Sequence, residues 1–208
     1  MMKRALFITT TVSLALVFAV GYIVQYVSLR YDATFYSVEY FVFLLLASAP
    51  LSIAEAEEYQ IQEPFYLYLL RNFLPTFFGV LILSLVANIA IQIAIQIEGG
   101  FSVSFLSFLI PQIILHIYYI LGWWLLQRIL RRFLWKTSTP EISFRKFIIA
   151  ILIAIVAALA HSICGYASLM QMLVTPNYSQ VGLLYGAQQG VIFLVFMVAG
   201  ALDSKIKP

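Results

Sequence analysis

The sequence predicts an all-α, polytopic integral membrane protein with six transmembrane helices and with both termini in the cytoplasm. Three observations lead to this fold class. The composition is too apolar for a water-soluble domain, six apolar stretches are long enough to cross a bilayer, and the lysine and arginine residues fall almost entirely on one side. We expect residues 1–208 to form a single transmembrane domain.

The composition excludes an ordinary soluble fold. Of the 208 residues, 63% are hydrophobic and 10% are charged, whereas soluble domains are roughly 45–50% apolar and about 25% charged. A soluble domain of this size has too small an interior to bury so much apolar surface. The single cysteine, Cys164, rules out an intrachain disulfide and a zinc motif with paired cysteines.

Six segments are long enough to span a membrane, since a helix needs roughly 20 apolar residues to cross the hydrocarbon core. They are residues 5–29, 36–54, 76–97, 102–127, 147–173 and 181–202. The alternation typical of barrel strands is absent, and helices satisfy every backbone amide within lipid. The first segment exceeds the roughly 7–15 residues of a signal-peptide core, so we expect an uncleaved helix. The second segment is the weakest, because it carries Glu39 and Pro50.

The charged loops set the orientation. With a cytoplasmic N-terminus, eleven of the twelve lysines and arginines fall on the cytoplasmic side and Arg30 alone lies outside. This is the positive-inside pattern of a protein of the cytoplasmic (inner) membrane. Five or seven helices would break the partition, so the charges support the helix count and the topology together. Basic residues that act as loop anchors do not indicate a nucleic-acid partner.

Polar side chains recur at helical spacing inside the spans. In segment 76–97 an amide or hydroxyl side chain returns every four residues, which places these groups on one face. One interpretation is a solute site near the middle of the membrane, and the other is a set of interhelical hydrogen bonds of about 0.6–2 kcal/mol each. The residues assigned to the solute site are Asn88, Gln92, Gln112, His116, His161 and Gln189.

His116 and His161 are the two histidines of the chain, and each lies near the middle of its segment. Two facing imidazoles can ligate a b-type haem, which makes a membrane-embedded redox protein one alternative. The other interpretation is two neutral histidines that hydrogen-bond to nearby amides. The spacing assigns no metal site and no cofactor. Cys164 lies three residues after His161, and we interpret it as a packing residue because its segment supplies no electropositive group.

Small residues mark faces for helix packing. Gly182, Gly186 and Gly190 recur every four residues, and segment 147–173 carries small residues at the same spacing. Such faces let helix backbones approach closely. We expect the last two helices to pack tightly, on each other or on a partner subunit.

The loop between the second and third segments is acidic. Its glutamates are Glu55, Glu57, Glu58 and Glu63. Acidic residues on the side that favours positive charge indicate a docking site for a partner subunit. A carboxylate pair for metal-assisted chemistry and a solvated loop are the other interpretations. We interpret the basic stretch 127–136 as a topology anchor, and binding of anionic lipid headgroups by its arginines is the alternative.

The favoured function is a small permease, or the membrane subunit of a transport complex, that handles a small or amphipathic solute. The alternatives are a structural or assembly subunit without a site of its own and the haem protein described above. The spans contain no Ser/His/Asp or paired-aspartate signature, so an enzyme is not favoured and no catalytic residue is assigned. The expected partners are bilayer lipids and a cytoplasmic or membrane subunit.

Overall fold

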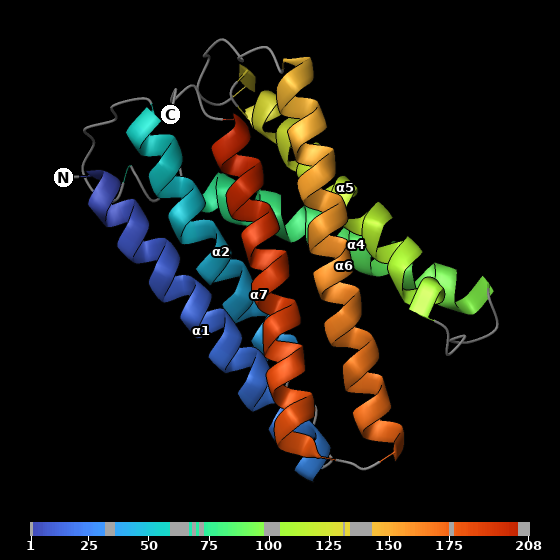
Figure 1. The fold of residues 1–208 in the computed structure, drawn as a ribbon. Helices are drawn as coiled ribbons and strands as arrows, with labels where there is room; N and C mark the ends of the chain where they lie inside the picture. Colours follow the sequence, from blue (N-terminus) through green and yellow to red (C-terminus); the bar gives the residue numbers. More distant parts are fainter. Residues whose placement is uncertain are drawn as a thin grey trace.

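The computed structural model describes residues 2–31, 36–58, 67, 70, 73–97, 105–130, 132–133, 143–174 and 177–203. Over these residues the fold is helical, without strands. The helices, labelled as in Figure 1, are α1 (Met2–Tyr31), α2 (Tyr36–Glu58), α4 (Leu74–Ile97), α5 (Phe105–Leu130), α6 (Phe144–Val174) and α7 (Tyr178–Asp203). The all-α prediction is confirmed for this part of the chain.

Most helices extend beyond the apolar segments from which they were predicted. α2 continues to Glu58, and α6 begins at Phe144 and so includes Arg145 and Lys146. Glutamate, lysine and arginine are good helix formers, so the helix continues when the sequence turns polar. α5 begins at Phe105 and ends at Leu130, three residues later at each end than the predicted segment 102–127.

Four helices have the length and composition to cross a membrane. They contain the stretches Leu6–Tyr31, Phe105–Ile129, Phe144–Val174 and Tyr178–Leu202. Within the described part of the chain, α2 and α4 contribute shorter apolar stretches, Glu39–Ile53 and Leu74–Ala87. The helical, apolar character expected of a membrane protein is therefore present in the structure.

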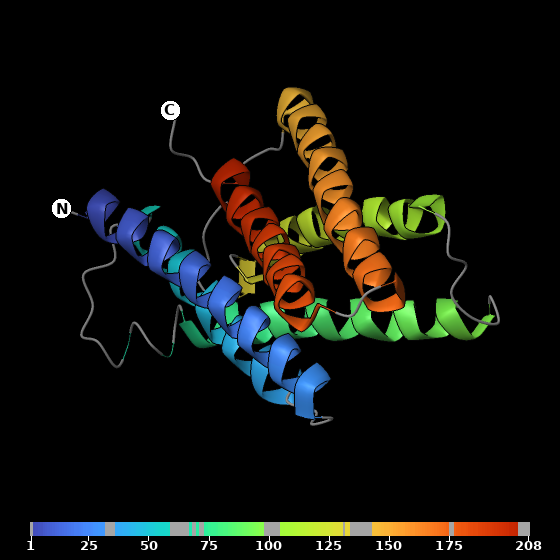
Figure 2. The ribbon, with the colours of Figure 1, turned by 60° about the horizontal axis from the view of Figure 1, so that its bottom comes forward.

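α7 is the central helix of the bundle, because it contacts α1, α2, α5 and α6. α1 and α7 run antiparallel along one another, while α4 and α5 run at a marked angle to α1 and α2 (Figures 1 and 2). The start of α1, the end of α5, the start of α6 and the end of α7 lie at the same end of the bundle (Figure 1).

The glycine face of α7 packs against α1. A Cβ atom built on Gly186 would lie 2.6 Å from the carbonyl oxygen of Phe18, and one on Gly182 would lie 3.0 Å from that of Tyr22. A Cβ atom built on Gly21 of α1 would likewise lie 3.2 Å from the Cα atom of Gly186. The two backbones thus approach as closely as small residues allow, and the partner of the glycine face is the first helix.

The small-residue face of α6 points into the bundle. Ala150, Ala154 and Ala158 are fully buried there, whereas Val156 and Ile163 on the opposite face are 66% and 58% exposed. Large apolar side chains exposed together in this way mark a surface that contacts a membrane or another protein. The same helix therefore presents one face to its neighbours and one apolar face to the outside of the bundle.

All six helices contribute to the core, and its tryptophans lie where α5 and α7 meet. Trp123 is fully buried and packs edge-to-face on Phe196, with ring centroids 6.3 Å apart. The indole nitrogen of Trp124 donates a hydrogen bond to the carbonyl oxygen of Ala199 at 2.9 Å. Each tryptophan therefore fixes α5 against the last turns of α7.

Candidate functional site

The structure brings the two histidines into contact. His116 on α5 is fully buried, His161 on α6 is 9% exposed, and their ring centroids lie 5.3 Å apart with the planes at 82°. Aromatic rings at this distance and angle pack edge to face. The sequence alone did not fix the distance between these residues, because they belong to different helices.

A hydrogen bond to the backbone determines which ring nitrogen of His116 carries the hydrogen. Nδ1 of His116 lies 2.7 Å from the backbone carbonyl oxygen of Gln112, one turn earlier on α5. A carbonyl oxygen only accepts, so Nδ1 carries the hydrogen and donates it. In a neutral imidazole the other nitrogen then has a free lone pair, so Nε2 of His116 is an acceptor.

One nitrogen of each histidine ring is left without a hydrogen bond among the described residues. Nε2 of His116 and Nδ1 of His161 are buried, and neither has a partner among the residues that the structure describes. The side-chain oxygen of Gln112 is in the same state. Buried polar atoms are nearly always paired with protein or with water, so these three atoms on α5 and α6 have hydrogen-bonding capacity that the described residues leave unused.

An amide on α7 contacts the backbone of His161. The side-chain nitrogen of Gln188 lies 3.4 Å from the backbone oxygen of His161, to which it donates. Its neighbour Gln189 faces another way, because its side chain lies against Gly21 of α1. The structure thus gathers Gln112, His116, His161 and Gln188, and it places Gln189 at a different interface. We refer to these four residues as the histidine cluster.

Two residues assigned to the solute site fall outside this description. Asn88 and Gln92 belong to α4, but their side chains are not among those the structure describes. The same holds for the side chains of Glu55, Glu57 and Glu58, and Glu63 lies wholly outside the described residues. The predicted docking site and the α4 part of the predicted solute site therefore stay predictions.

The geometry of the histidine pair does not fit a haem. Two histidine ligands must stand on opposite faces of the porphyrin, each with a nitrogen directed at the iron. Here the rings touch each other edge to face, so no room remains for a porphyrin plane between them. Among the described residues no three His, Cys, Asp or Glu side chains come together as metal ligands either.

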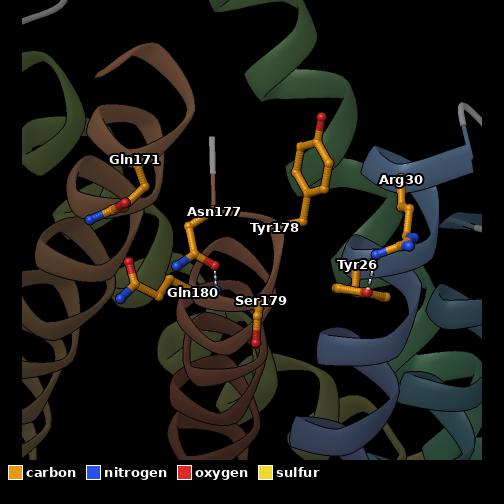
Figure 3. Close-up of a pocket in the computed structure, with 7 residues that line it drawn as sticks. All are labelled: Tyr26, Arg30, Gln171, Asn177, Tyr178, Ser179 and Gln180. Carbon is orange, nitrogen blue, oxygen red and sulfur yellow. Dashed lines mark hydrogen bonds between the residues drawn. The ribbon is translucent and has the colours of Figure 1, made fainter. Parts of the chain in front are cut away.

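A second polar feature is a pocket at the end of the bundle where α1 and α6 end and α7 begins. Its volume is about 530 Å³ (Figure 3). Arg30 in this pocket donates a hydrogen bond to the hydroxyl of Tyr26 at 2.9 Å, and its guanidinium lies 5.9 Å from the centre of that ring. The pocket is lined by Tyr26, Arg30, Gln171, Asn177, Tyr178, Ser179 and Gln180.

Local sequence explains how α7 begins at this pocket. The side-chain oxygen of Asn177 accepts a hydrogen bond from the backbone nitrogen of Gln180, and the backbone oxygen of Asn177 accepts one from Val181. Asparagine is a preferred N-cap residue because its side-chain oxygen satisfies an otherwise free backbone amide of the first turn. The hydroxyls of Tyr22 and Ser179 lie 3.3 Å apart and join α1 to the first turn of α7.

An acidic residue is buried at the same end of the bundle. Glu39, in the first turn of α2, is 5% exposed, and its Oε2 accepts a hydrogen bond from the hydroxyl of Tyr185 on α7 at 3.2 Å. Neither residue was assigned a role from the sequence. There, Glu39 was only a reason to consider segment 36–54 the weakest of the predicted transmembrane segments. An acid inside an apolar stretch is itself a recognised indicator of a functional site.

Comparison with known proteins gives no match. No protein-family model, no curated protein and no solved structure matches the chain. The function therefore has to be argued from the geometry described above.

Proposed function

We propose that the chain is a small permease or the membrane subunit of a transport complex, and that a small or amphipathic solute passes through the histidine cluster. In this proposal all six helices cross the cytoplasmic membrane and both termini are cytoplasmic. α2 and α4, with 23 and 24 residues, are each about 35 Å long by helix rise. That length suffices for a hydrocarbon core of about 30 Å.

The observation that carries this proposal is the pair of unpaired ring nitrogens in the histidine cluster. Nε2 of His116 and Nδ1 of His161 are buried without a hydrogen-bond partner among the described residues. Polar residues that serve helix packing are expected to bond to each other across the interface. Nitrogens left unpaired in this way, and the unpaired side-chain oxygen of Gln112, are instead available to a solute or to water that accompanies it.

The proposed topology is supported by the arrangement of the basic residues. Arg128 near the end of α5 and Arg145 and Lys146 near the start of α6 belong to the end of the bundle where α1 begins (Figure 1). Arg30 belongs to the opposite end, beside the start of α7. The positive-inside rule then places the first of these ends in the cytoplasm. The acidic residues from Glu55 to Glu63 would face the same compartment, where we propose that they dock a partner subunit.

Cysteine accessibility tests the proposed pathway without knowledge of the solute. In a Cys164→Ser background, His161→Cys places a thiol in the histidine cluster, and the matched control Ile163→Cys places one on the lipid-facing side of α6. A water-filled pathway supports the thiolate, whereas lipid suppresses it. We expect the cysteine at 161 to react with a small cationic methanethiosulfonate reagent about ten times faster than the cysteine at 163. A tenfold difference in the thiolate fraction corresponds to a difference of one unit in the pKa of the thiol.

The alternative function predicts a different result in the same experiment. If the chain is a structural or assembly subunit, the histidine cluster is closed to water and the cysteines at 161 and 163 react equally slowly in intact vesicles. That outcome would contradict the proposed pathway.

A further inference from the structure

The carboxyl of Glu39 is buried in the bundle, and no described basic side chain is paired with it. Glu39 is 5% exposed, and the hydroxyl of Tyr185 reaches only its Oε2. The other oxygen, Oε1, is buried without a hydrogen-bond partner among the described residues. Removing a carboxylate from water without pairing it is very costly, and such groups are paired or neutralised in proteins.

No basic side chain in the described structure takes that role. The nearest in sequence is Arg30, across the short connection from α1 to α2, and its guanidinium is engaged by the rings of Tyr26 and Tyr31. Lys3 and Arg4 belong to the first turn of α1, about 40 Å away by helix rise. The positive end of the α2 dipole favours a first-turn acid, but by only about 0.3–2 kcal/mol.

The helices packed on α2 carry few titratable groups that bear on Glu39. α7 presents Tyr185, which donates to Oε2. α4 has no ionisable side chain over Leu74–Ala87. On α2 itself Tyr40 is the neighbouring titratable side chain among those that the structure describes.

α1 carries Tyr22 and Tyr26 near this end in addition to Arg30. The hydroxyl of Tyr22 pairs with Ser179, and that of Tyr26 accepts from Arg30. Among the side chains that the structure describes, the titratable groups near Glu39 other than Arg30 are therefore tyrosines, which do not supply a positive charge.

We propose that Glu39 is a proton-binding site of the bundle. A proton from water forms an O–H bond at Oε1 and leaves the carboxyl neutral, while Tyr185 holds Oε2. A single carboxyl with one phenol beside it offers too few oxygen ligands for a metal cation, so the structure favours a proton. Loss of the proton would leave an unpaired negative charge between α2 and α7. Binding of the proton is therefore coupled to how closely these two helices pack. The proposal does not depend on the solute pathway through the histidine cluster.

Labelling with dicyclohexylcarbodiimide tests this site in the full-length protein in lipid nanodiscs. The apolar reagent adds to a protonated carboxyl and leaves an N-acylurea, which peptide mass spectrometry assigns to a residue. We expect an adduct on Glu39 that disappears as the pH is raised across roughly 5 to 9, since a buried glutamate can titrate as high as about pH 8–9. Above the titration point each pH unit should lower the labelled fraction about tenfold.

Two variants and a salt comparison sharpen the experiment. Glu39→Gln should remove the adduct, and Tyr185→Phe should keep it and let it persist to more alkaline pH, because the carboxylate loses its donor. Exchanging choline chloride for sodium chloride at fixed pH should change nothing. Infrared difference spectra of the wild type between the pH extremes supply a second measurement, in which the band of a protonated carboxylic acid should be lost at high pH.

Three results would overturn the proposal. One is the absence of a Glu39 adduct at every pH, together with no carboxylic-acid band in the infrared spectra. Another is an adduct that forms equally at all pH values, which would show a carboxyl that does not exchange its proton. The third is suppression of the adduct by sodium but not by choline, which would assign the site to a metal cation.

Discussion

Replacing Gly186 with alanine is expected to lower the free energy of unfolding by about 2–3 kcal/mol, the cost of overpacking a close contact. The new Cβ atom would lie 2.6 Å from the carbonyl oxygen of Phe18 and 3.3 Å from the backbone nitrogen of Tyr22. Both are backbone atoms of α1 and cannot rotate aside, so the two helices must move apart. Unfolding by sodium dodecyl sulfate in mixed micelles, followed by tryptophan fluorescence, measures the change.

Gly190→Ala is the matched control for this substitution. It lies on the same face one turn later, and a Cβ there would meet only the tip of Leu14 at 3.5 Å, an ordinary van der Waals distance. Alanine is also favoured over glycine inside a helix by about 0.5–1 kcal/mol. We therefore expect Gly190→Ala to be neutral or slightly stabilising. Equal losses at both positions would contradict the close α1–α7 crossing.

Trp123→Ala is expected to cost about 3 kcal/mol, the lower end of the range for removing a large aromatic side chain from a core. Trp123 is fully buried and packs on Phe196, so its removal leaves a cavity between α5 and α7. We expect the lower end of this range because lipid tails are as apolar as the core. The main cost of the substitution is then the loss of packing contacts. The same unfolding titration measures it, with far-ultraviolet circular dichroism replacing tryptophan fluorescence.

The control for Trp123 lies two residues further along α5. Leu125 is 62% exposed, and lipid can fill the space that alanine leaves there. We expect Leu125→Ala to change stability by no more than about 0.5 kcal/mol. A loss at Leu125 as large as that at Trp123 would mean that α5 is turned differently in the bundle.

The sequence was sufficient for features that depend on one helix at a time. Runs of apolar residues predicted the six helices, and the small-residue spacing in α6 marked the face that Ala150, Ala154 and Ala158 bury. These predictions hold because helix periodicity ties spacing to a face directly. The ends of the helices were less predictable, because residues such as Lys146 and Glu58 are polar and yet continue the helix.

Features that depend on how two helices pack together could not be predicted from the sequence. Gly186 marked a close approach, but α1 as its partner depends on how α7 turns within the bundle. The 5.3 Å contact of His116 and His161 depends in the same way on the crossing of α5 and α6. Glu39 was treated as a defect of an apolar segment, because its partner Tyr185 lies 146 positions away in the sequence.

The central claim is that lipid surrounds this bundle, and spin labels along α6 in proteoliposomes test it most directly. Labels replacing Val156 and Ile163 should relax strongly with oxygen, which dissolves in lipid, and weakly with a water-soluble nickel chelate. Labels replacing the buried Ala154 and Ala158 should respond weakly to both, giving a helical period that follows the exposure pattern of α6. Strong relaxation by the nickel chelate at positions 156 and 163 would show water on that face and would contradict the account.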